Sequence, residues 1–548
     1  MPHIQGIQRD AVLLFPSSLD EYITDDNPVR FIDAFVDELD LHDLGFLRAL
    51  PNPMGRPAYA PGDLLKLSIY GYLNRIRSSR LLERESQRNI EVIWLLKKLT
   101  PDFKTIADFR KNNLRAIKDV CRCFTLLCKE LDLFGGELVA IDGCKFKAVN
   151  NYTRNFTDKR FERVLRELDE AIAGYLQELQ NQDAQEQALP PVVKDLQIRI
   201  ERLRTRKAEY ERLRHQLQQS TETQLSLTDP DSRAMVTARG TVVGYNVQFT
   251  TDAKHKLIVD HEVTNDVTDQ NQLAAMALRA KEVFGVARLD ALADSGFYDG
   301  EQIKACIDAG ITPWVPKPHT SRNQQQGLFT KDDFSYLADQ DSYRCPSGAE
   351  LTYRFSTVED GRPQRYYASP ACGSCPIRAQ CTRSQKNGRR ITRWEHEGLL
   401  DAMAERIRSD RAFMRRRKTI VEHPFGTMKR GMQQGDFLLR GLGKVAGEMS
   451  LTVLTYNLKR VLTLLGVPKL LAALREGRLE QAVQQLDRAG TQHLYWKCLY
   501  DCMKRAIRCG IRGQVLNQAQ WPIKAPATFH TVSAWSRRRF AAPRSVAF

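Results

Sequence analysis

LVAIDGCKFKA (residues 138–148) is the stretch that decides how this chain folds, because a short apolar run ends there in the carboxylate of Asp142. An apolar run of this length, followed by a glycine, is typical of a buried strand that reaches the edge of a sheet. LDALADSGFYDG (residues 289–300) repeats the pattern and ends its apolar run at Asp294. We therefore expect Asp142 and Asp294 to end two neighbouring strands at one edge of a sheet.

A third carboxylate, Glu422, lies in the strongly basic segment RRRKTIVEHPFGTMKRG (residues 415–431), which is typical of a helix. Basic residues recur around it at steps that a continuous helix would place on one face. Pro424 removes one helical hydrogen bond and predicts a kink or a new helix start at this point. The residues that share the face are Arg415, Lys418, Glu422 and Lys429.

Three carboxylates in this arrangement can hold two divalent metal ions about 4 Å apart against a phosphodiester. Oxygen ligands suit Mg²⁺ or Mn²⁺. We expect Asp142 to bridge both ions, Asp294 and Glu422 each to hold one, and the flanking basic side chains to hold DNA. Further aspartates near the predicted strands are alternatives to Asp142 and Asp294, although most are interpreted as turn or capping residues. These are Asp231, Asp252, Asp260, Asp266 and Asp269.

The charge of the chain favours a polyanionic partner. Its 548 residues include 82 Lys and Arg against 66 Asp and Glu, a net charge of +16. Residues 490–548 carry ten Lys or Arg and one Asp, which indicates either a phosphate-binding arm or a solvated tail. No membrane segment, secretory signal or phosphate-loop motif is visible, so we expect a cytoplasmic protein that uses no nucleotide cofactor.

Residues 1–130 are predicted to be helical and to carry a basic edge. Arg110 and Lys111 lie on this edge and could contact DNA phosphates, although a solvated helical face would carry the same residues. The apolar spacing predicts helices over 64–76, 79–88 and 91–99, and one long helix from about residue 105.

A mixed α/β pattern follows, interrupted by one insertion. Apolar stripes over 158–181 and 192–217, joined by a polar linker, predict an antiparallel helical hairpin that serves packing. Strands are expected over 241–265, as a hairpin around DAKHK, and over 289–294 and 311–317, with helices over 270–284 and 299–308. This order favours a sheet at the centre of the domain.

Four cysteines gather in a segment rich in turn residues and too poor in apolar residues for a core. Four thiolates suit a structural Zn²⁺ ion, which would supply the folding energy that such a segment lacks. Four free cysteines are the alternative. The cysteines are Cys345, Cys372, Cys375 and Cys381.

Together these motifs resemble the DDE transposases of bacterial insertion sequences, over roughly residues 10–465. The N-terminal motifs are LFPSSLDEYITDDNPVRFIDAFVDELDL (14–41) and YAPGDLLKLSIYGYLNRIRSSRLLERES (59–86). The others are VAIDGCKFKA, VGYNVQFTTDAKHKLIVDHEVTN, ALADSGFYDG, CGSCPIRAQCT and VEHPFGTMK. The family signature of Tyr, two residues, Arg, three residues, Glu, six residues, Lys is met by Glu422 and Lys429. Arg415 and Lys418 replace its Tyr and Arg, and Lys cannot make the bidentate contact of Arg.

The resemblance implies an α/β fold with an RNase H-like mixed-sheet catalytic core. It also implies that Asp142, Asp294 and Glu422 are the catalytic metal ligands, with two Mg²⁺ or Mn²⁺ per active site. The implied domains are a helical DNA-binding domain (1–130), the core (131–465) and a basic tail (466–548). The core would hold the helical-hairpin insertion (156–220) and the cysteine-rich zinc insert (340–385).

The implied function is cleavage at the ends of an insertion sequence followed by strand transfer into target DNA. The partner would be double-stranded DNA, bound by a homodimer or a higher oligomer associated with the nucleoid. Two alternatives stay open. The first is an RNase H-like nuclease that only hydrolyses, and the second is a catalytically inactive, transposase-derived DNA-binding regulator.

Overall fold

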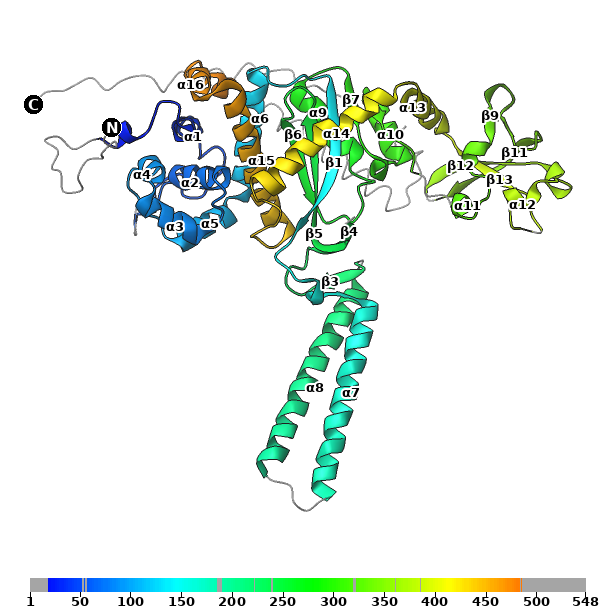
Figure 1. The fold of residues 1–548 in the computed structure, drawn as a ribbon, viewed down its shortest axis with the longest axis horizontal. Helices are drawn as coiled ribbons and strands as arrows, with labels where there is room; N and C mark the ends of the chain where they lie inside the picture. The colour runs from blue at the N-terminus through cyan, green and yellow to red at the C-terminus, as the bar shows by residue number, and fades with distance from the viewer. Residues whose placement is uncertain are drawn as a thin grey trace, which may run out of the picture. The chain divides into compact units, whose positions relative to one another are not determined.

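Figure 1 shows the computed structural model of the chain. It describes residues 18–484, apart from short gaps at 52–53, 55–56, 185–189, 221, 238–239, 319–321, 360, 385 and 483. The chain divides into two units, Met1–Leu486 and Asp487–Phe548. The second unit, and with it most of the predicted tail over 466–548, lies outside the described residues. The described start of that tail forms helix α16 (Val467–Arg475), whose Leu470 and Leu474 are buried.

A six-stranded mixed sheet lies at the centre of the first unit, as the sequence predicts. Strand β1 runs antiparallel to β5 on one side and parallel to β7 on the other, and β8 continues parallel to β7. Strands β4 and β6 both pair antiparallel with β5. The strands are β1 (Leu138–Lys147), β4 (Arg233–Thr237), β5 (Gly240–Asp252), β6 (Ile258–Thr264), β7 (Leu289–Leu292) and β8 (Ile311–Trp314).

Helices cover the sheet. Figure 1 shows α14 (Arg411–Gly426) crossing over β1. Its Ile420 and Val421 pack against Leu138 and Ala140 of β1 in an apolar cluster. The other helices of this part are α9 (Leu273–Phe284), α10 (Gly300–Asp308), α13 (Glu397–Ser409) and α15 (Leu442–Leu465). In the described part of the chain, no helix is long and apolar enough to cross a membrane.

The N-terminal part is helical, but the long helix predicted from about residue 105 is wrong. It is broken at Asn113, whose backbone leaves the helical conformation while its side chain joins the end of α5 to Leu47. Its Oδ1 accepts a hydrogen bond from the Leu47 backbone N–H at 2.8 Å, and its Nδ2 donates to the Phe109 carbonyl at 2.9 Å. The helices are α1 (Pro28–Asp37), α2 (Pro61–Leu73), α3 (Ser79–Arg88), α4 (Ile90–Leu95), α5 (Phe103–Asn112) and α6 (Leu114–Glu130).

One hydrophobic core joins these helices to the sheet. Phe31 and Phe124 from the N-terminal helices belong to the same buried cluster as Val139 of β1 and Tyr456 of α15. Helix α6 packs so closely on α15 that a methyl group at Gly447 would lie 2.7 Å from a methyl carbon of Leu114. Packing therefore crosses the domain boundary predicted between residues 130 and 131.

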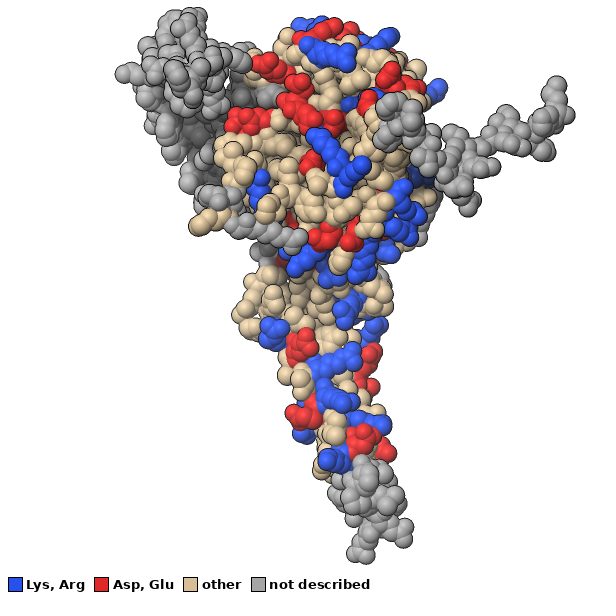
Figure 2. Space-filling model, turned by 90° about the vertical axis from the view of Figure 1, so that its left-hand side faces the viewer, with Lys and Arg blue, Asp and Glu red and all other residues tan. Residues whose placement is uncertain are grey.

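The predicted helical hairpin is confirmed as α7 (Asp158–Ala184) and α8 (Pro190–Gln219). At its base, β2 (Asn155–Thr157) pairs with β3 (Gln224–Ser226), beside a small apolar cluster of its own. Basic and acidic side chains alternate along the hairpin (Figure 2). Arg214 of α8, for example, lies 2.8 Å from the Asp158 carboxylate.

The cysteine-rich insert folds around a second sheet with strand order β13-β12-β11-β10-β9. Its core contains Phe334, Tyr343, Leu351 and Tyr367. The prediction that this segment has too little apolar content for a core is therefore wrong, because aromatic side chains spread over several strands meet on one face. The strands are β9 (Ser335–Leu337), β10 (Ser342–Arg344), β11 (Glu350–Glu359), β12 (Arg362–Ala368) and β13 (Arg390–Trp394).

Candidate active site

Asp142 lies within β1 and is partly buried. Burial raises its pKa to about 6. The Arg417 guanidinium, with Nη1 3.2 Å from Asp142 Oδ2, opposes this rise, and the negative charges of Asp294 and Asp269 add to it. Asp142 is thus a crowded carboxylate whose ionised form is stabilised by a nearby cation.

Asp294 follows β7, the parallel neighbour of β1. Ala140 of β1 is paired with Leu292 of β7, and each aspartate comes two residues later. The two carboxylates therefore lie at the same edge of the β1–β7 pair. The prediction that Asp142 ends its strand is wrong, because β1 continues to Lys147 in its pairing with β5. The chain turns sharply at Asp294, which accepts a hydrogen bond from the Gly296 backbone N–H at 2.8 Å.

Glu422 lies on α14, the helix that crosses β1, and its side chain is exposed. Its carboxylate does not form a compact group of possible metal ligands with those of Asp142 and Asp294. Among the described residues, the one group of three or more such ligand atoms within 4.8 Å of one another is an exposed turn, Asp40, His42 and Asp43. At Asp142 the contact from α14 is instead made by Arg417.

Lys429 reaches the active-site strand from the opposite end of the same helical segment. After Pro424 the helix continues and widens into a π-helical turn, η7 (Thr427–Gly431). The missing proline N–H accounts for a loosened hydrogen-bond ladder there. Lys429 Nζ lies 2.9 Å from the Lys145 carbonyl and 2.8 Å from Cys144 Sγ, just beyond Asp142.

The other predicted DNA contacts differ in exposure. Arg415 and Lys418 are exposed on α14, and Lys111 is exposed at the end of α5. Arg110 is 8% exposed, and its guanidinium donates a hydrogen bond to the Arg77 carbonyl at 2.7 Å. In this structure Arg110 therefore holds two N-terminal segments together.

Asp269 is a further carboxylate at this edge, which the sequence offers only as one of five alternative aspartates and does not single out. It accepts hydrogen bonds from Asn246 Nδ2 and Gln248 Nε2, each at 2.6 Å, and from Lys145 Nζ at 3.2 Å. The signal that could have found it is the pair Asn246 and Gln248. These are polar side chains two residues apart in the mainly apolar run VVGYNVQF (242–249), so they lie on one face.

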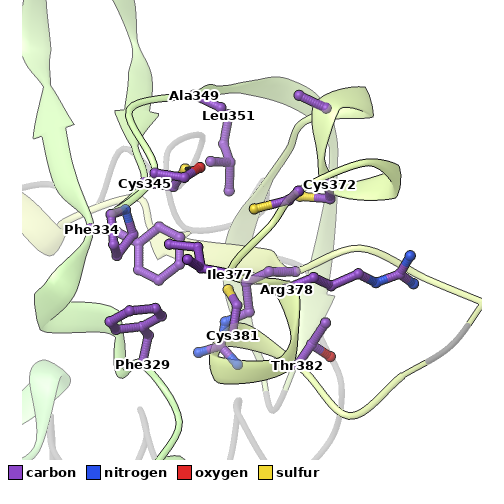
Figure 3. Close-up of a pocket in the computed structure, with 15 residues that line it drawn as sticks. Phe329, Phe334, Cys345, Ala349, Leu351, Cys372, Ile377, Arg378, Cys381 and Thr382 are labelled. Atoms are coloured by element: carbon purple, nitrogen blue, oxygen red, sulfur yellow. Dashed lines mark hydrogen bonds between the residues drawn. The ribbon is translucent and has the colours of Figure 1, made fainter.

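The four cysteines of the insert line one small cavity of about 30 Å³ (Figure 3). Their Sγ atoms are not all within 4.8 Å of one another, and Cys345 Sγ lies 3.0 Å from Ser347 Oγ. Burial raises the pKa of the Cys381 thiol, while Arg389 lowers it. The cavity is large enough for a single small ion, and four sulfur donors suit tetrahedral zinc.

Two segments match models of known families. Residues 17–112 match a transposase domain (DUF772), and residues 344–462 match a transposase DDE domain. The second match contains Glu422 and all four cysteines of the insert, whereas Asp142 and Asp294 precede it. Both matches confirm the family predicted from the sequence motifs.

Comparison with solved structures and curated proteins adds little. The chain is similar to one described as the cryo-EM structure of piggyBac transposase synaptic complex with hairpin DNA. Sequence identity is 10%, the alignment covers 95% of this chain and 91% of the other, and the TM-score is 0.29. A TM-score this low does not show a shared fold. No curated protein matches the chain.

Proposed function

We propose that this chain, which its two matched segments identify as a DDE transposase, cuts DNA at the ends of an insertion sequence and joins the freed 3′ ends to target DNA. The observation that carries the proposal is the pairing of β1 with β7. This pairing brings Asp142 and Asp294 to one sheet edge, beneath the helix that carries Glu422.

Asp142, Asp294 and Glu422 are the residues proposed to hold two Mg²⁺ or Mn²⁺ ions. The donor set fits, because all three offer carboxylate oxygens. Burial is the main cause of the raised pKa of Asp142, and the negative charges of Asp294 and Asp269 add to it, so a divalent cation here would favour the ionised carboxylate. Bound metal would stabilise charge on the attacking and leaving oxygens of the phosphodiester. Arg417, the cation beside Asp142 in this structure, would have to give way to it.

The sheet supports the RNase H-like core that the resemblance implies. Three antiparallel strands, β6, β5 and β1, are followed by β7 and β8 running parallel to β1. The first aspartate then lies on the central strand and the second at the end of its parallel neighbour. The helical hairpin and the cysteine-rich insert are placed in loops, so neither changes this order of strands.

DNA would lie over the edge that carries Asp142. Lys429 is held beside β1, and Arg415 and Lys418 are exposed on the helix of Glu422, so all three could contact backbone phosphates. Lys111 offers a further exposed cation on the N-terminal helices. A homodimer or higher oligomer on the DNA, located with the nucleoid in the cytoplasm, belongs to the same proposal.

Structural zinc at the four cysteines is a separate part of the proposal. Its support is that Cys345, Cys372, Cys375 and Cys381 all line one cavity, although Cys345 lies far along the chain from the other three. Zinc would tie these turns to the second sheet.

The triad is tested by changing its members singly. Asp142→Ala, Asp294→Ala and Glu422→Ala should each abolish cleavage of labelled element ends in Mg²⁺ while preserving DNA binding in EDTA. Asp266→Asn, at an exposed aspartate outside the triad, is the matched control. Wild-type cleavage by any of the three alanine variants would remove that residue from the triad.

Strand-transfer products separate the proposed function from its alternatives. A transposase joins the labelled 3′ end to a target plasmid, whereas a nuclease that only hydrolyses yields the cut end alone. A DNA-binding regulator yields neither product in Mg²⁺ or Mn²⁺, yet still binds the ends.

A further inference from the structure

Asp269, in the loop between β6 and α9, is fixed in place by the sheet. Its Oδ1 accepts hydrogen bonds from Asn246 Nδ2 and Gln248 Nε2, each at 2.6 Å, and from Lys145 Nζ at 3.2 Å. Asn246 and Gln248 are fully buried residues of strand β5. Although Asp269 is a loop residue, its carboxylate is therefore held by the core of the sheet.

The second oxygen of Asp269 lies toward the proposed metal ligands. A methyl group built at Gly296 would lie 3.7 Å from Asp269 Oδ2 and 3.0 Å from Asp294 Oδ1, so both carboxylates flank this glycine. A methyl group at Gly143, the residue after Asp142, would lie 2.4 Å from Asp269 Oδ1. Asp269 thus lies against the backbone that follows each of the two aspartates.

The buried amides carry a second, independent signal. Asn246 Oδ1 and Gln248 Oε1 have no hydrogen-bond partner among the described residues, although both side chains are fully buried. Gln248 Oε1 would lie 2.9 Å from a methyl group at Gly143, so it is directed at the same edge. A buried oxygen without a donor is costly, and the water that Mg²⁺ or Mn²⁺ retains is a donor suited to such a place.

We propose that Asp269 is a fourth carboxylate of the active centre and binds, through Oδ2, the divalent cation held by Asp294. This inference rests on the proposed function, because Asp294 is a metal ligand only there. The two amides engage Oδ1 alone, and among the described residues Oδ2 has only the long 3.5 Å contact with Lys145 Nζ, which the ion would replace. The glycines at positions 143 and 296 provide the space that this arrangement needs.

The test is Mn²⁺ binding to the full-length protein without DNA, measured by electron paramagnetic resonance. Asp269→Asn should weaken Mn²⁺ binding by roughly tenfold to a hundredfold, the range found when groups around a metal are removed. Asp266→Asn, in the same loop but exposed, should bind Mn²⁺ as the wild type does. Thermal unfolding in EDTA reports whether each variant is folded.

Asp269→Cys covers the case in which the Asn variant is poorly folded. A thiolate prefers a softer ion, so this variant should bind Cd²⁺ more tightly relative to Mn²⁺ than the wild type does. A ratio between two ions in one sample does not depend on how much of the sample is folded. An unchanged ratio, or wild-type Mn²⁺ affinity in a folded Asn variant, would overturn the inference.

Asp294→Asn distinguishes failure of this inference from failure of the proposed function. If Asp294→Asn loses Mn²⁺ binding and Asp269→Asn does not, the metal site stands and Asp269 is excluded from it. If neither substitution affects Mn²⁺ binding, both the metal site proposed at this edge and the role of Asp269 fall.

Discussion

At the scale of single residues, Gly143 shows how little space the active-site edge offers. A methyl group there would lie 2.4 Å from Asp269 Oδ1 and 2.7 Å from Gln248 Nε2, so Gly143→Ala must displace the Asp269 carboxylate or the strand. We expect a loss of about 1–3 kcal/mol in the free energy of unfolding, as for other overpacked sites, and a fall in cleavage rate larger than this loss explains. Cleavage and thermal unfolding are measured together.

Gly398→Ala is the matched control for Gly143→Ala. No heavy atom lies within 4 Å of a methyl group added at Gly398. The stability and activity of the Gly398→Ala variant should therefore stay near wild type. Wild-type cleavage by Gly143→Ala would contradict the crowding described at this edge.

The buried side chain of His261 should make the free energy of unfolding depend on pH. It is 7% exposed, and burial lowers its pKa to about 4. Unfolding returns the pKa to about 6.5. Between pH 4 and pH 6.5 the unfolded chain therefore binds a proton that the folded chain does not. Stability is therefore fully retained above about pH 6.5 and falls toward pH 4, by at most about 3 kcal/mol from this residue.

His261→Gln should flatten that part of the stability profile. The change is followed as the thermal unfolding midpoint between pH 7 and pH 4.5. The exposed His215 supplies the control, because His215→Gln should leave the wild-type slope unchanged. A wild-type slope in His261→Gln would mean that other groups set the acid sensitivity.

Sequence patterns could predict single residues where the chemistry is local, and they failed where it is not. The neighbouring positions of Asp142 and Asp294 could be predicted because each ends its own apolar run, whereas their role as metal ligands stays a proposal. The position of Asp269 could not be predicted, because its partners Asn246, Gln248 and Lys145 come from two other strands. The contact of Arg417 with Asp142 joins residues 275 positions apart, and no spacing rule reveals it.

At the scale of elements, periodicity predicted the hairpin α7–α8 and the strands of the central sheet other than β4, because these depend on repeated apolar positions. It missed the break between α5 and α6, where the apolar pattern continues but the Asn113 side chain binds Leu47. It left open what Pro424 does. In the structure the helix passes through Pro424, whose missing N–H is followed by the π-helical turn that carries Lys429.

The cysteine-rich insert supports a prediction at this scale. Purified, reduced protein should contain one zinc ion per chain, because four thiols line one cavity. Replacing Cys372 and Cys375 together by serine should remove the zinc and lower the thermal unfolding midpoint. Ser374→Ala, between them, should keep the zinc. Elemental analysis measures the zinc content of each protein. Absence of zinc from the wild type, or retention of zinc in the double variant, would refute the site.

At the scale of the whole molecule, the N-terminal helices and the sheet share one core, so deleting residues 1–130 would remove part of that core. Hydrogen bonds also join the N-terminal helices to the segment that follows α14. Arg77 donates to the Asp436 carbonyl at 2.7 Å, and the buried Glu448 accepts from the backbone N–H of Leu438 and Leu439. These contacts hold residues 436–439. The same segment pairs with the end of β1, since the Phe437 N–H donates to the Lys147 carbonyl at 2.9 Å. DNA binding by these helices is therefore better tested with point substitutions.

Arg110 and Lys111 are adjacent basic residues with opposite surroundings, and they provide that test. Arg110→Ala removes a buried guanidinium that holds the Arg77 carbonyl, so it should lower stability by about 1–3 kcal/mol. Lys111→Ala removes an exposed cation, so thermal unfolding should stay near wild type. If Lys111 contacts a phosphate, the slope of log affinity for element ends against log salt should fall by about 0.9. An unchanged slope would exclude that contact, and wild-type stability of Arg110→Ala would contradict its structural role.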